Sequence, residues 1–377
     1  MKKTLAAVAV LGAFAGSALA ADVTLYGVID TGFNWTQTKV TGKDTTNSFS
    51  MASGQNSGSR FGLKGTEDLG DGWKVGFNLE NSFNSDDGSL DKGGRLFHRE
   101  ALLFVQSPYG ELSMGRTGAL DAGTGRYNLM GSNATPFGTG LDTIGASTLI
   151  LKGTGSRMDN TVTYQSPTFA GVTLFAQASL KTSTQAYDKD QKKIVYNEDQ
   201  EGSSDAERYY GLGAKFSAEG LNAGLVFSTT DYSRNYVNKD DDDNGYVVSG
   251  FVNYDFGMVK PMLAAQYWDN GDKLNAVKTT AAAKRTGTKG YGVELGATAP
   301  VLGGTVKAAA GWNDYEDVAD TDTDYNNWMV GVSYEYQLSK RTTLYTGAGY
   351  SEVKTKATAT TSKTKTTEVL AGLVHKF

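Results

Sequence analysis

The stretch RLFHREALLFVQSPYGELSMGR (Arg95–Arg116) contains the pattern that decides the fold. Two strand-like runs, ending in ALLFVQ and beginning with ELSMGR, flank SPYG, a composition typical of a tight turn. The next 40 residues, 117–156, are rich in Gly, Thr and Asp and have no hydrophobic period. So long a loop inside a compact domain is uncommon unless it has a function. We therefore expect a β-hairpin that leads into a functional loop.

The rest of the chain after Ala21 repeats the strand signal. In the segment 328–338, apolar and aromatic residues alternate with Gly331, Ser333, Glu335 and Gln337. Alternation with period two indicates a strand with one apolar and one polar face. About sixteen such runs begin near Val23, Arg60, Trp73, Phe97, Glu111, Asn160, Val172, Arg208, Leu221, Tyr246, Met258, Tyr291, Thr305, Asn327, Thr342 and Thr366.

The connections between these runs are of two alternating kinds. Tight turns are expected at 68–72, 107–110, 166–171, 218–220, 256–257, 300–304 and 338–341. Long polar loops are expected at 36–57, 83–94, 117–156, 182–207, 231–244, 269–289, 317–326 and 354–365. Short turns on one rim and long loops on the other predict an all-β, 16-stranded antiparallel up-and-down barrel in an outer membrane.

A soluble β-sandwich or a secreted adhesin is the alternative to a membrane barrel. A sandwich seldom reaches sixteen strands in one domain. Many apolar faces here also end in aromatic residues that suit the two membrane interfaces: Tyr246, Tyr254, Phe256, Tyr267, Trp268, Trp312, Tyr334, Tyr336 and Tyr350. We expect the last run, ending at Phe377, to pair with the first near Val23, because closure removes both sheet edges.

Composition and the N-terminus indicate an exported protein. Residues 1–20 have the basic start, apolar centre and small-residue site of a signal peptide cleaved after Ala20, which leaves a single barrel domain at 21–377. The whole chain has 36 basic and 41 acidic residues, so without Lys2 and Lys3 the charge is 34 − 41 = −7. This charge disfavours nucleic acid as a partner. With no cysteine, the chain has no disulfides.

Several motifs resemble the general porins of Gram-negative bacteria, especially the trimeric β-proteobacterial type. They are VTLYGVIDTGFN, SRFGLKGTEDLGDGWKVGFNLE, LFHREALLFVQSPYGELSMGR, SRMDNTVTYQSPTFAGVTLFAQ and the aromatic C-terminus. The resemblance covers essentially the whole mature chain and is most specific in its first 180 residues. It implies sixteen strands, short periplasmic turns, a homotrimer and a third external loop, 117–156, that folds inward to narrow the pore.

The resemblance also implies which residues form the pore constriction. Arg60 in SRFG, Arg99 in FHREA and Arg157 in RMDNTVTY take positions on the barrel wall. Arg116 in MGR stands where its strand enters the loop. Asp121 and Asp142 are expected to face the arginines from the loop, whose tip is Pro136–Gly138. The tract ASTLIL (Ala146–Leu151) departs from the family pattern.

Arginine suits such a wall because its charge is permanent and its planar fork is rigid. Arginines facing carboxylates would create a transverse field that filters ions. Alternatively, each arginine pairs with a local carboxylate, for example Arg99 with Glu100 or Glu111. Strict alternation creates a difficulty at Arg99. If Arg99 faces inward, its neighbour Glu100 must face outward, where a charged side chain is unfavourable. Alternation places Glu80 inward, and Lys64 is expected beside it on the lumen wall.

Catalysis and metal binding are disfavoured. Any Ser–His arrangement would depend on His98 or His375, and the run Asp240–Asp243 lacks the spaced ligands of a calcium loop. No cofactor is expected. We predict a passive channel for small hydrophilic solutes and ions, with mild anion selectivity as a hypothesis. A substrate-selective channel, for example for carboxylates, and a barrel acting as an adhesin or structural protein remain alternatives. Expected partners are lipopolysaccharide, outer-membrane lipid, and the outer-membrane assembly machinery acting through Phe377.

Overall fold

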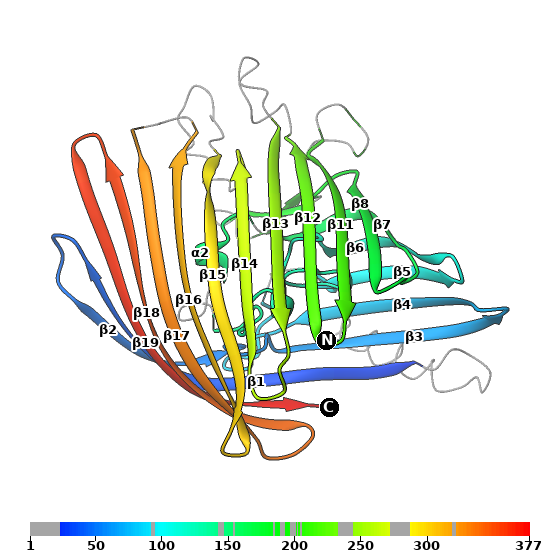
Figure 1. Ribbon diagram of the computed structural model, residues 1–377, viewed down its shortest axis with the longest axis horizontal. Helices are drawn as coiled ribbons and strands as arrows, with labels where there is room; N and C mark the ends of the chain where they lie inside the picture. Colours follow the sequence, from blue (N-terminus) through cyan, green and yellow to red (C-terminus); the bar gives the residue numbers. More distant parts are fainter. Residues whose placement is uncertain are drawn as a thin grey trace.

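Sixteen antiparallel strands form one closed barrel in the computed structural model (Figure 1). The structure describes residues 23–91, 95–141, 147–153, 155–183, 185–188, 193–196, 201, 203, 206–232, 244–271, 287–318 and 322–377. The barrel strands are β1 (Thr24–Val40), β3 (Arg60–Gly70), β4 (Trp73–Ser82), β5 (Glu100–Ser107), β6 (Gly110–Gly118), β7 (Arg157–Gln165), β8 (Val172–Ser179), β11 (Arg208–Ala218), β12 (Leu221–Asp231), β13 (Gly245–Tyr254), β14 (Lys260–Asp269), β15 (Thr288–Val301), β16 (Gly304–Asp317), β17 (Asp324–Gln337), β18 (Thr342–Ala357) and β19 (Thr360–Lys376). The loops contain β2 (Thr46–Ser53), η1 (Gly131–Asn133), α2 (Ser147–Ile150), β9 (Gln185–Asp188) and β10 (Lys193–Tyr196). The predicted signal peptide lies outside the described residues.

Pairing between the first and last strands closes the barrel. β1 runs antiparallel to β19 from the pair Val28–Lys376 to the pair Val40–Thr364. Gly27 and Phe377 extend this ladder with two backbone hydrogen bonds, each with an N···O distance of 3.1 Å. Each barrel strand therefore has a neighbour on both sides, as a bilayer without water requires. The predicted sixteen-stranded closed barrel is confirmed.

Several strands reach further than the sequence pattern predicted. β18 and β19 run up to a tight turn at 358–359, so most of the expected loop 354–365 is strand. β1 continues to Val40, and the expected loop 36–57 contains β2, which pairs with the upper part of β1. The extensions of β1, β18 and β19 are rich in Thr, Ser and Lys and lack the apolar alternation that marks the membrane-spanning part, so the pattern missed them. β2 has a short alternation, with Phe49 and Met51 between serines, and Phe49 stacks on Phe33 of β1.

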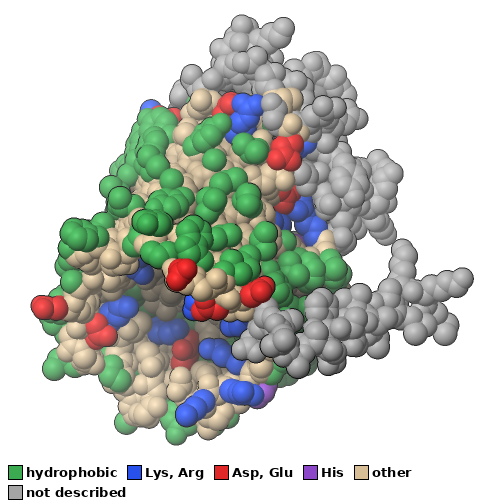
Figure 2. Space-filling model, turned by 90° about the vertical axis from the view of Figure 1, so that its right-hand side faces the viewer, with side chains coloured by type: hydrophobic (Ala, Val, Ile, Leu, Met, Phe, Trp, Pro, Cys, Tyr) green, Lys and Arg blue, Asp and Glu red, His purple; other side chains and the backbone are tan. Residues whose placement is uncertain are grey.

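The outer face of the barrel is apolar with aromatic residues near both ends. Tyr291 packs on Trp312 and Trp328 on Tyr350 towards the loop end, with ring centroids 5.5 and 5.0 Å apart. Towards the turn end Tyr254 packs on Phe256. In the space-filling view hydrophobic side chains cover much of the wall, and charged ones gather at a hollow (Figure 2). Trp268, expected on the outer face, is instead fully buried against Tyr315.

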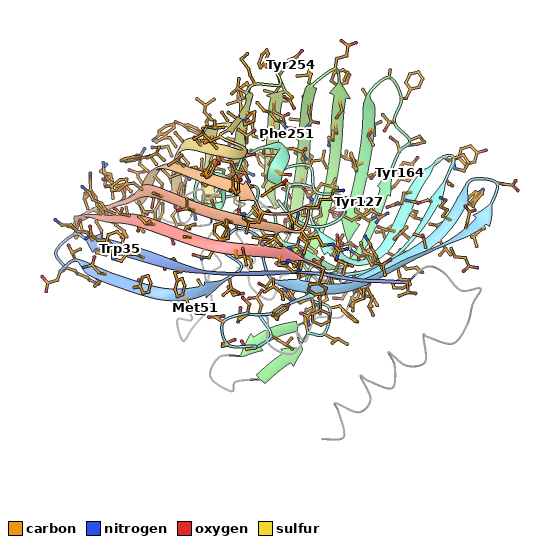
Figure 3. The ribbon with its side chains drawn as sticks, turned by 90° about the horizontal axis from the view of Figure 1, so that it is seen from below. Trp35, Met51, Tyr127, Tyr164, Phe251 and Tyr254 are labelled. Carbon is orange, nitrogen blue, oxygen red and sulfur yellow. The ribbon has the colours of Figure 1, made fainter. Side chains whose placement is uncertain are left out.

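The described residues between β6 and β7 lie inside the barrel, as predicted for the third loop (Figure 1). Their buried side chains, among them Leu129, Phe137 and Ile150, form one apolar cluster with inward residues of the wall. Tyr127 lies in the interior, whereas Tyr164 and Tyr254 lie on the outer surface (Figure 3). Among the described residues, no helix has the length and apolar character needed to cross a membrane.

Where the loop comes closest to the barrel wall, on β15 and β16, the wall has glycine at inward positions. A Cβ atom at Gly311 would lie 2.6 Å from Ile150 Cγ1, and one at Gly296 would overlap the Pro136 ring. A larger inward residue on β15 or β16 would therefore push the loop off the wall. The tract ASTLIL supplies the Ile150 and Leu151 side chains that pack here.

We expect Gly27→Val to weaken barrel closure. A Cβ atom at Gly27 would overlap the Phe377 ring and lie 2.7 Å from the Arg60 carbonyl oxygen. Crowding of this kind costs about 1–3 kcal/mol. The measurement is the temperature at which the folded barrel loses its compact gel mobility. Gly250→Val is the matched control, because its nearest neighbour lies 3.5 Å away. Equal melting temperatures for the two variants would contradict the role given to this junction.

Candidate functional site

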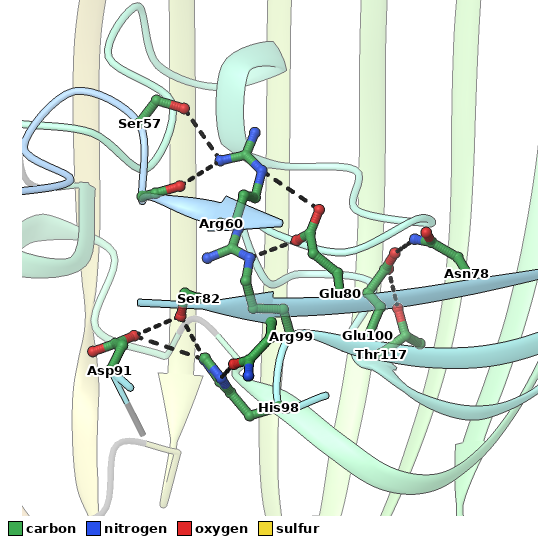
Figure 4. A network of polar contacts seen from close by, with 12 residues as sticks. Ser57, Arg60, Asn78, Glu80, Ser82, Asp91, His98, Arg99, Glu100 and Thr117 are labelled. Atoms are coloured by element: carbon green, nitrogen blue, oxygen red, sulfur yellow. Dashed lines mark hydrogen bonds and ion pairs between the residues drawn. The ribbon is translucent and has the colours of Figure 1, made fainter. Parts of the chain in front are cut away.

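A carboxylate on β4 holds two of the predicted wall arginines together (Figure 4). Arg99 Nε lies 2.5 Å from Glu80 Oε1, and Arg60 Nε lies 3.4 Å from Glu80 Oε2. The Tyr26 hydroxyl donates to the same Oε2 atom at 3.0 Å. Glu80, expected only as a lumen residue, is thus the acid that fixes both guanidinium groups.

Arg157 and Glu100 complete this cluster. Arg157 begins β7 and interacts electrostatically with Arg99, Glu80 and Glu100. Its Nε atom is buried without a hydrogen-bond partner among the described residues. Glu100 accepts hydrogen bonds from Asn78 Nδ2, from Thr117 Oγ1 at 2.9 Å and from the Arg126 backbone amide at 2.5 Å. Three arginines therefore share two carboxylates, a formal excess of one positive charge.

The position of Arg99 resolves the parity problem of the sequence. β5 begins at Glu100, so Arg99 precedes the strand and is not bound by its alternation. Glu100 is inward and buried, while Leu103 is 52% exposed on the outer face. Arg99 pairs with Glu80 rather than with Glu100 or Glu111, the local alternatives.

Arg116 belongs to a different ion cluster. Its Nη1 atom lies 2.5 Å from Asp159 Oδ1, and its Nε atom donates to the His98 carbonyl oxygen at 2.7 Å. Arg95 binds the same Asp159 carboxylate through two hydrogen bonds of 2.7 and 2.8 Å. The structure therefore does not bring Arg116 to Glu80.

Asp121 does not face the arginines, which corrects the expectation for this residue. It is 1% exposed, and its Oδ2 atom accepts a hydrogen bond from Ser228 Oγ of β12 at 2.8 Å. The loop turns this side chain into the wall because its neighbours Ala119, Leu120 and Ala122 are buried there too. Asp142, the other acid expected on the loop, lies outside the described residues.

The loop is fastened to the wall at several points that the sequence pattern did not identify. Arg126 stacks on Phe104, with Cζ 3.8 Å from the ring centre, and forms two hydrogen bonds with Glu111. Further along, wall side chains bind loop backbone atoms in three places: Asn253 Nδ2 to Asn133 O at 2.7 Å, Gln266 Oε1 to Gly153 N at 2.7 Å, and Asn313 Nδ2 to Leu149 O at 2.7 Å. Asn and Gln at inward strand positions were the available signal.

A second inward excursion, residues 54–59, supports Arg60 from the other side. Here the chain leaves β2 and enters the lumen before β3 begins. Asp30 fixes it by accepting the amides of Asn56 and Ser57, each at 2.7 Å. Ser57 and Gly58 accept from Arg60 Nη1 at 3.2 and 2.8 Å. The long loop meets the excursion through the hydrogen bond from Leu141 N to Gln55 O, at 2.5 Å.

Lys64 lies on the lumen wall beside this site, as the sequence predicts. Its Nζ atom is 5.2 Å from the centre of the Tyr26 ring. It lines a cavity of about 560 Å³ together with Asn78, Gln106 and Arg126. Among the described residues, no carboxylate lies within ion-pair distance of Lys64 in the structure.

His98 is held in a polar pocket but not in a catalytic geometry. Its Nε2 atom lies 3.0 Å from Ser82 Oγ, and its Nδ1 atom lies 3.1 Å from Asn81 Oδ1 (Figure 4). In a Ser–His–Asp triad the acid binds the ring nitrogen opposite the serine. Asp91 instead approaches Nε2, at 3.7 Å, so this arrangement does not prepare Ser82 as a nucleophile.

The structure has the arrangement that the motifs implied. It is a closed barrel of sixteen strands with a loop folded inside it and arginines on the wall. The family model described as "Gram-negative porin" matches residues 6–356. The chain belongs to this family. It is an outer-membrane porin, and porins are channels rather than enzymes, which confirms the prediction against catalysis.

Relatives of the porin lie in β-proteobacteria. It is 33% identical to an outer membrane porin protein of Bordetella pertussis, with both chains fully covered. It is 28% identical to outer membrane porin protein 32 of Delftia acidovorans over 92% of this chain and 88% of that protein. The fold resembles the solved anion-selective porin from Comamonas acidovorans, with a TM-score of 0.66, 23% identity, and coverage of 95% of this chain and all of that chain.

We expect Asp121 to make the porin less stable as the pH rises from about 4 to about 6. Burial raises the pKa of Asp121 to about 6, whereas an unfolded Asp titrates near 3.9. Between these values the folded state binds more protons than the unfolded state, so the free energy of unfolding falls with rising pH, by about 3 kcal/mol in total.

Urea unfolding of the refolded porin at several pH values measures this effect. Asp121→Asn, which cannot ionise, should lose the slope between pH 4 and 6 and keep the hydrogen bond from Ser228. The same slope in the wild type and in Asp121→Asn would show that other groups cause it.

Proposed function

We propose that this porin admits small hydrophilic solutes and ions by passive diffusion through a water-filled lumen that the segment 117–156 narrows. The observation that carries the proposal is the position of this segment inside the barrel, bound to the wall through Arg126, Asn133 and Leu149. A loop fixed in this way reduces the cross-section without sealing the barrel by a separate plug domain. The proposed constriction comprises Arg60, Arg99 and Arg157 on the wall.

A mild preference for anions follows from the charges at this constriction. The three arginines share Glu80 and Glu100, and the described part of the loop contributes no carboxylate towards them. The fixed field is therefore positive where the lumen narrows, and it attracts anions. The Comamonas acidovorans porin of similar fold is described as anion-selective, which agrees with this direction.

A channel selective for carboxylates is the second candidate, because of the cavity next to Lys64. Among the described residues this lysine has no carboxylate at ion-pair distance, so its charge faces the cavity, whereas the amides of Asn78 and Gln106 in the same cavity already donate to Glu100 and Glu111. A preferred carboxylate would bind there and slow the passage of chloride. An adhesin would instead depend on the external loops and would need no conductance.

Export and assembly follow from the family. Porins of this family are typically trimeric, and we infer a homotrimer here. We also infer that a signal peptide, 1–20, is removed and that the aromatic Phe377 is recognised by the outer-membrane assembly machinery. The hydrogen bonds between Phe377 and Gly27 support this inference, because a residue at the closing junction stays accessible until the barrel closes.

The porin should conduct ions when it is inserted into a planar bilayer. Stepwise current increases with one uniform size are expected from the refolded oligomer in salt solution. Absence of conductance from correctly folded oligomers would rule out both channel proposals and favour an adhesin. Block of the chloride current by millimolar concentrations of a small dicarboxylate, without block by a neutral sugar, would favour the selective channel.

Neutral glutamines at Arg60 and Arg99 should move the reversal potential in a salt gradient towards cations. One charge about 4 Å from an ion in water contributes about 1 kcal/mol, and it acts on anions and cations with opposite sign. The anion-to-cation permeability ratio should therefore fall by about 2 kcal/mol, or about thirtyfold, for each arginine removed. The matched control removes two outward lysines, Lys289→Gln with Lys356→Gln, and should leave this ratio unchanged. An identical fall in the control would mean that surface charge, not the constriction, sets selectivity.

A further inference from the structure

The excursion formed by residues 54–59 crosses the inner face of the wall beside the closing junction. Gln55 Nε2 donates to the Tyr345 hydroxyl of β18 at 3.3 Å. Asn56 Nδ2 donates to Glu335 Oε1 of β17 at 3.0 Å. Strand alternation turns both acceptors towards the lumen. The excursion therefore reaches from the start of β3 to β17, across β1, β19 and β18.

The wall under the excursion has room for these contacts. A Cβ atom at Gly32 of β1 would lie 2.6 Å from Gln55 Nε2, and one at Gly372 of β19 would lie 2.3 Å from the Tyr345 hydroxyl oxygen. The Tyr345 hydroxyl donates to Asp30 Oδ1 at 2.6 Å, and Asp30 Oδ2 accepts two backbone amides of the excursion, each at 2.7 Å. The excursion is therefore held by both side-chain and backbone hydrogen bonds.

The excursion and the long loop touch each other inside the barrel. Leu141 N donates to Gln55 O at 2.5 Å. A Cβ atom at Gly140 would lie 2.2 Å from Asn56 O, so the two segments have no gap between them here. On the other side of this contact, the Pro136 ring of the loop packs on β15. Two touching segments therefore line the lumen from β15 round to β3.

The excursion lies at the depth of the proposed constriction. Arg60 donates to Ser57 Oγ and to the Gly58 carbonyl oxygen (Figure 4). A Cβ atom at Gly58 would lie 3.2 Å from Arg99 Nη1. The passage beside these arginines is therefore bounded by the excursion as well as by the long loop. Its width depends on how far each of the two segments projects from the wall.

The excursion adds no charge of its own at this depth. Its sequence, GQNSGS, contains no ionisable side chain. The carboxylate that it contacts on β17, Glu335, is paired with Lys307 at 2.5 Å. An uncharged segment can exclude solutes by their width, whereas it leaves the sign of the field to the arginines and their carboxylates.

We propose that the excursion is a second size-limiting segment of the channel. It sets the width of the passage next to the arginine cluster, while the long loop sets the width on the side of β15 and β16. The solutes that it excludes are hydrophilic molecules, such as uncharged sugars, that are wider than this passage. The inference rests on the proposed diffusion of small solutes through the lumen and assigns part of its size limit to residues 54–59.

Deletion of residues 55–57 from the porin tests the proposal. A Cβ atom at Gly54 would lie 3.0 Å from Gly58 Cα, so these two glycines can be joined with little change in β2 or β3. Swelling of proteoliposomes in sugars of increasing size should show a severalfold faster entry of disaccharides relative to monosaccharides. Single-channel conductance should rise. The sign of the ion selectivity should stay the same, because the three wall arginines and their carboxylates remain.

A pair of alanine variants provides the matched control. Gln55→Ala with Asn56→Ala removes the two side-chain anchors and should change sugar entry in the same direction as the deletion, by a smaller factor. Gln37→Ala with Asn47→Ala removes the same residue types, which form an exposed hydrogen bond of 3.1 Å between β1 and β2, and should behave like the wild type. Wild-type sugar entry in the deletion variant, or an equal change in the control, would overturn the proposal.

A thiol reagent gives a second measurement that does not depend on folding of the deletion variant. The chain has no cysteine, so a single introduced thiol reacts alone. A bulky methanethiosulfonate reagent should reduce the current through Asn56→Cys and leave the current through Asn47→Cys unchanged. Full current through completely modified Asn56→Cys would contradict the role of the excursion. A wild type that does not conduct would contradict the proposed function itself, whereas a conducting wild type with unaffected variants would contradict only this inference.

Discussion

The absence of water from the hydrocarbon layer is the constraint on which the rest of this structure depends. Every backbone amide and carbonyl there needs a partner within the protein, which the pairing of β1 with β19 provides by removing both sheet edges. The closed wall then separates the lipid from the lumen, so every strand contacts both. Successive residues face lipid and lumen in turn, so Leu103 is exposed outward while Glu100 is buried inward on the same short strand. The same alternation made the fold predictable, because it is written in the sequence with period two.

The interior of the barrel is organised by a second requirement, which is room for the long loop. Small residues at inward positions of β15 and β16 let Pro136 and Ile150 approach the wall. Asn253, Gln266 and Asn313 then satisfy loop backbone groups that would otherwise be buried without partners. Packing and hydrogen bonding act on the same segment from different strands. The loop is therefore held as a fixed part of the lumen and not as a free external connection.

What the sequence could predict follows from which interactions are local. Strand number and closure follow from alternation and spacing, whereas the inward third loop follows from the resemblance to porins; these predictions are confirmed. Strand ends above the membrane were missed because Thr and Lys alternate there without an apolar face. Partners of side chains depend on three-dimensional neighbours: Asp121 is in the right loop but turns towards Ser228, and Arg99 reaches Glu80 because it stands just before β5. Neither contact can be predicted from the spacing of residues along the sequence. The contact between Ile150 and Gly311 likewise joins residues far apart in the sequence.

The barrel wall, and not the loop, supplies the carboxylates that balance the charge of the wall arginines. The acids next to Arg60, Arg99 and Arg157 come from the barrel strands, as Glu80 and Glu100, and not from Asp121 of the loop. Positions on paired strands are fixed by two ladders of backbone hydrogen bonds, whereas a loop depends on side-chain anchors. In the proposed channel the sign of the field is therefore set by the rigid wall, and the loop sets the width. A change in the loop sequence could then alter the size limit for solutes while leaving the charge preference in place. A change at Glu80 would do the reverse, because both guanidinium groups would lose their shared partner.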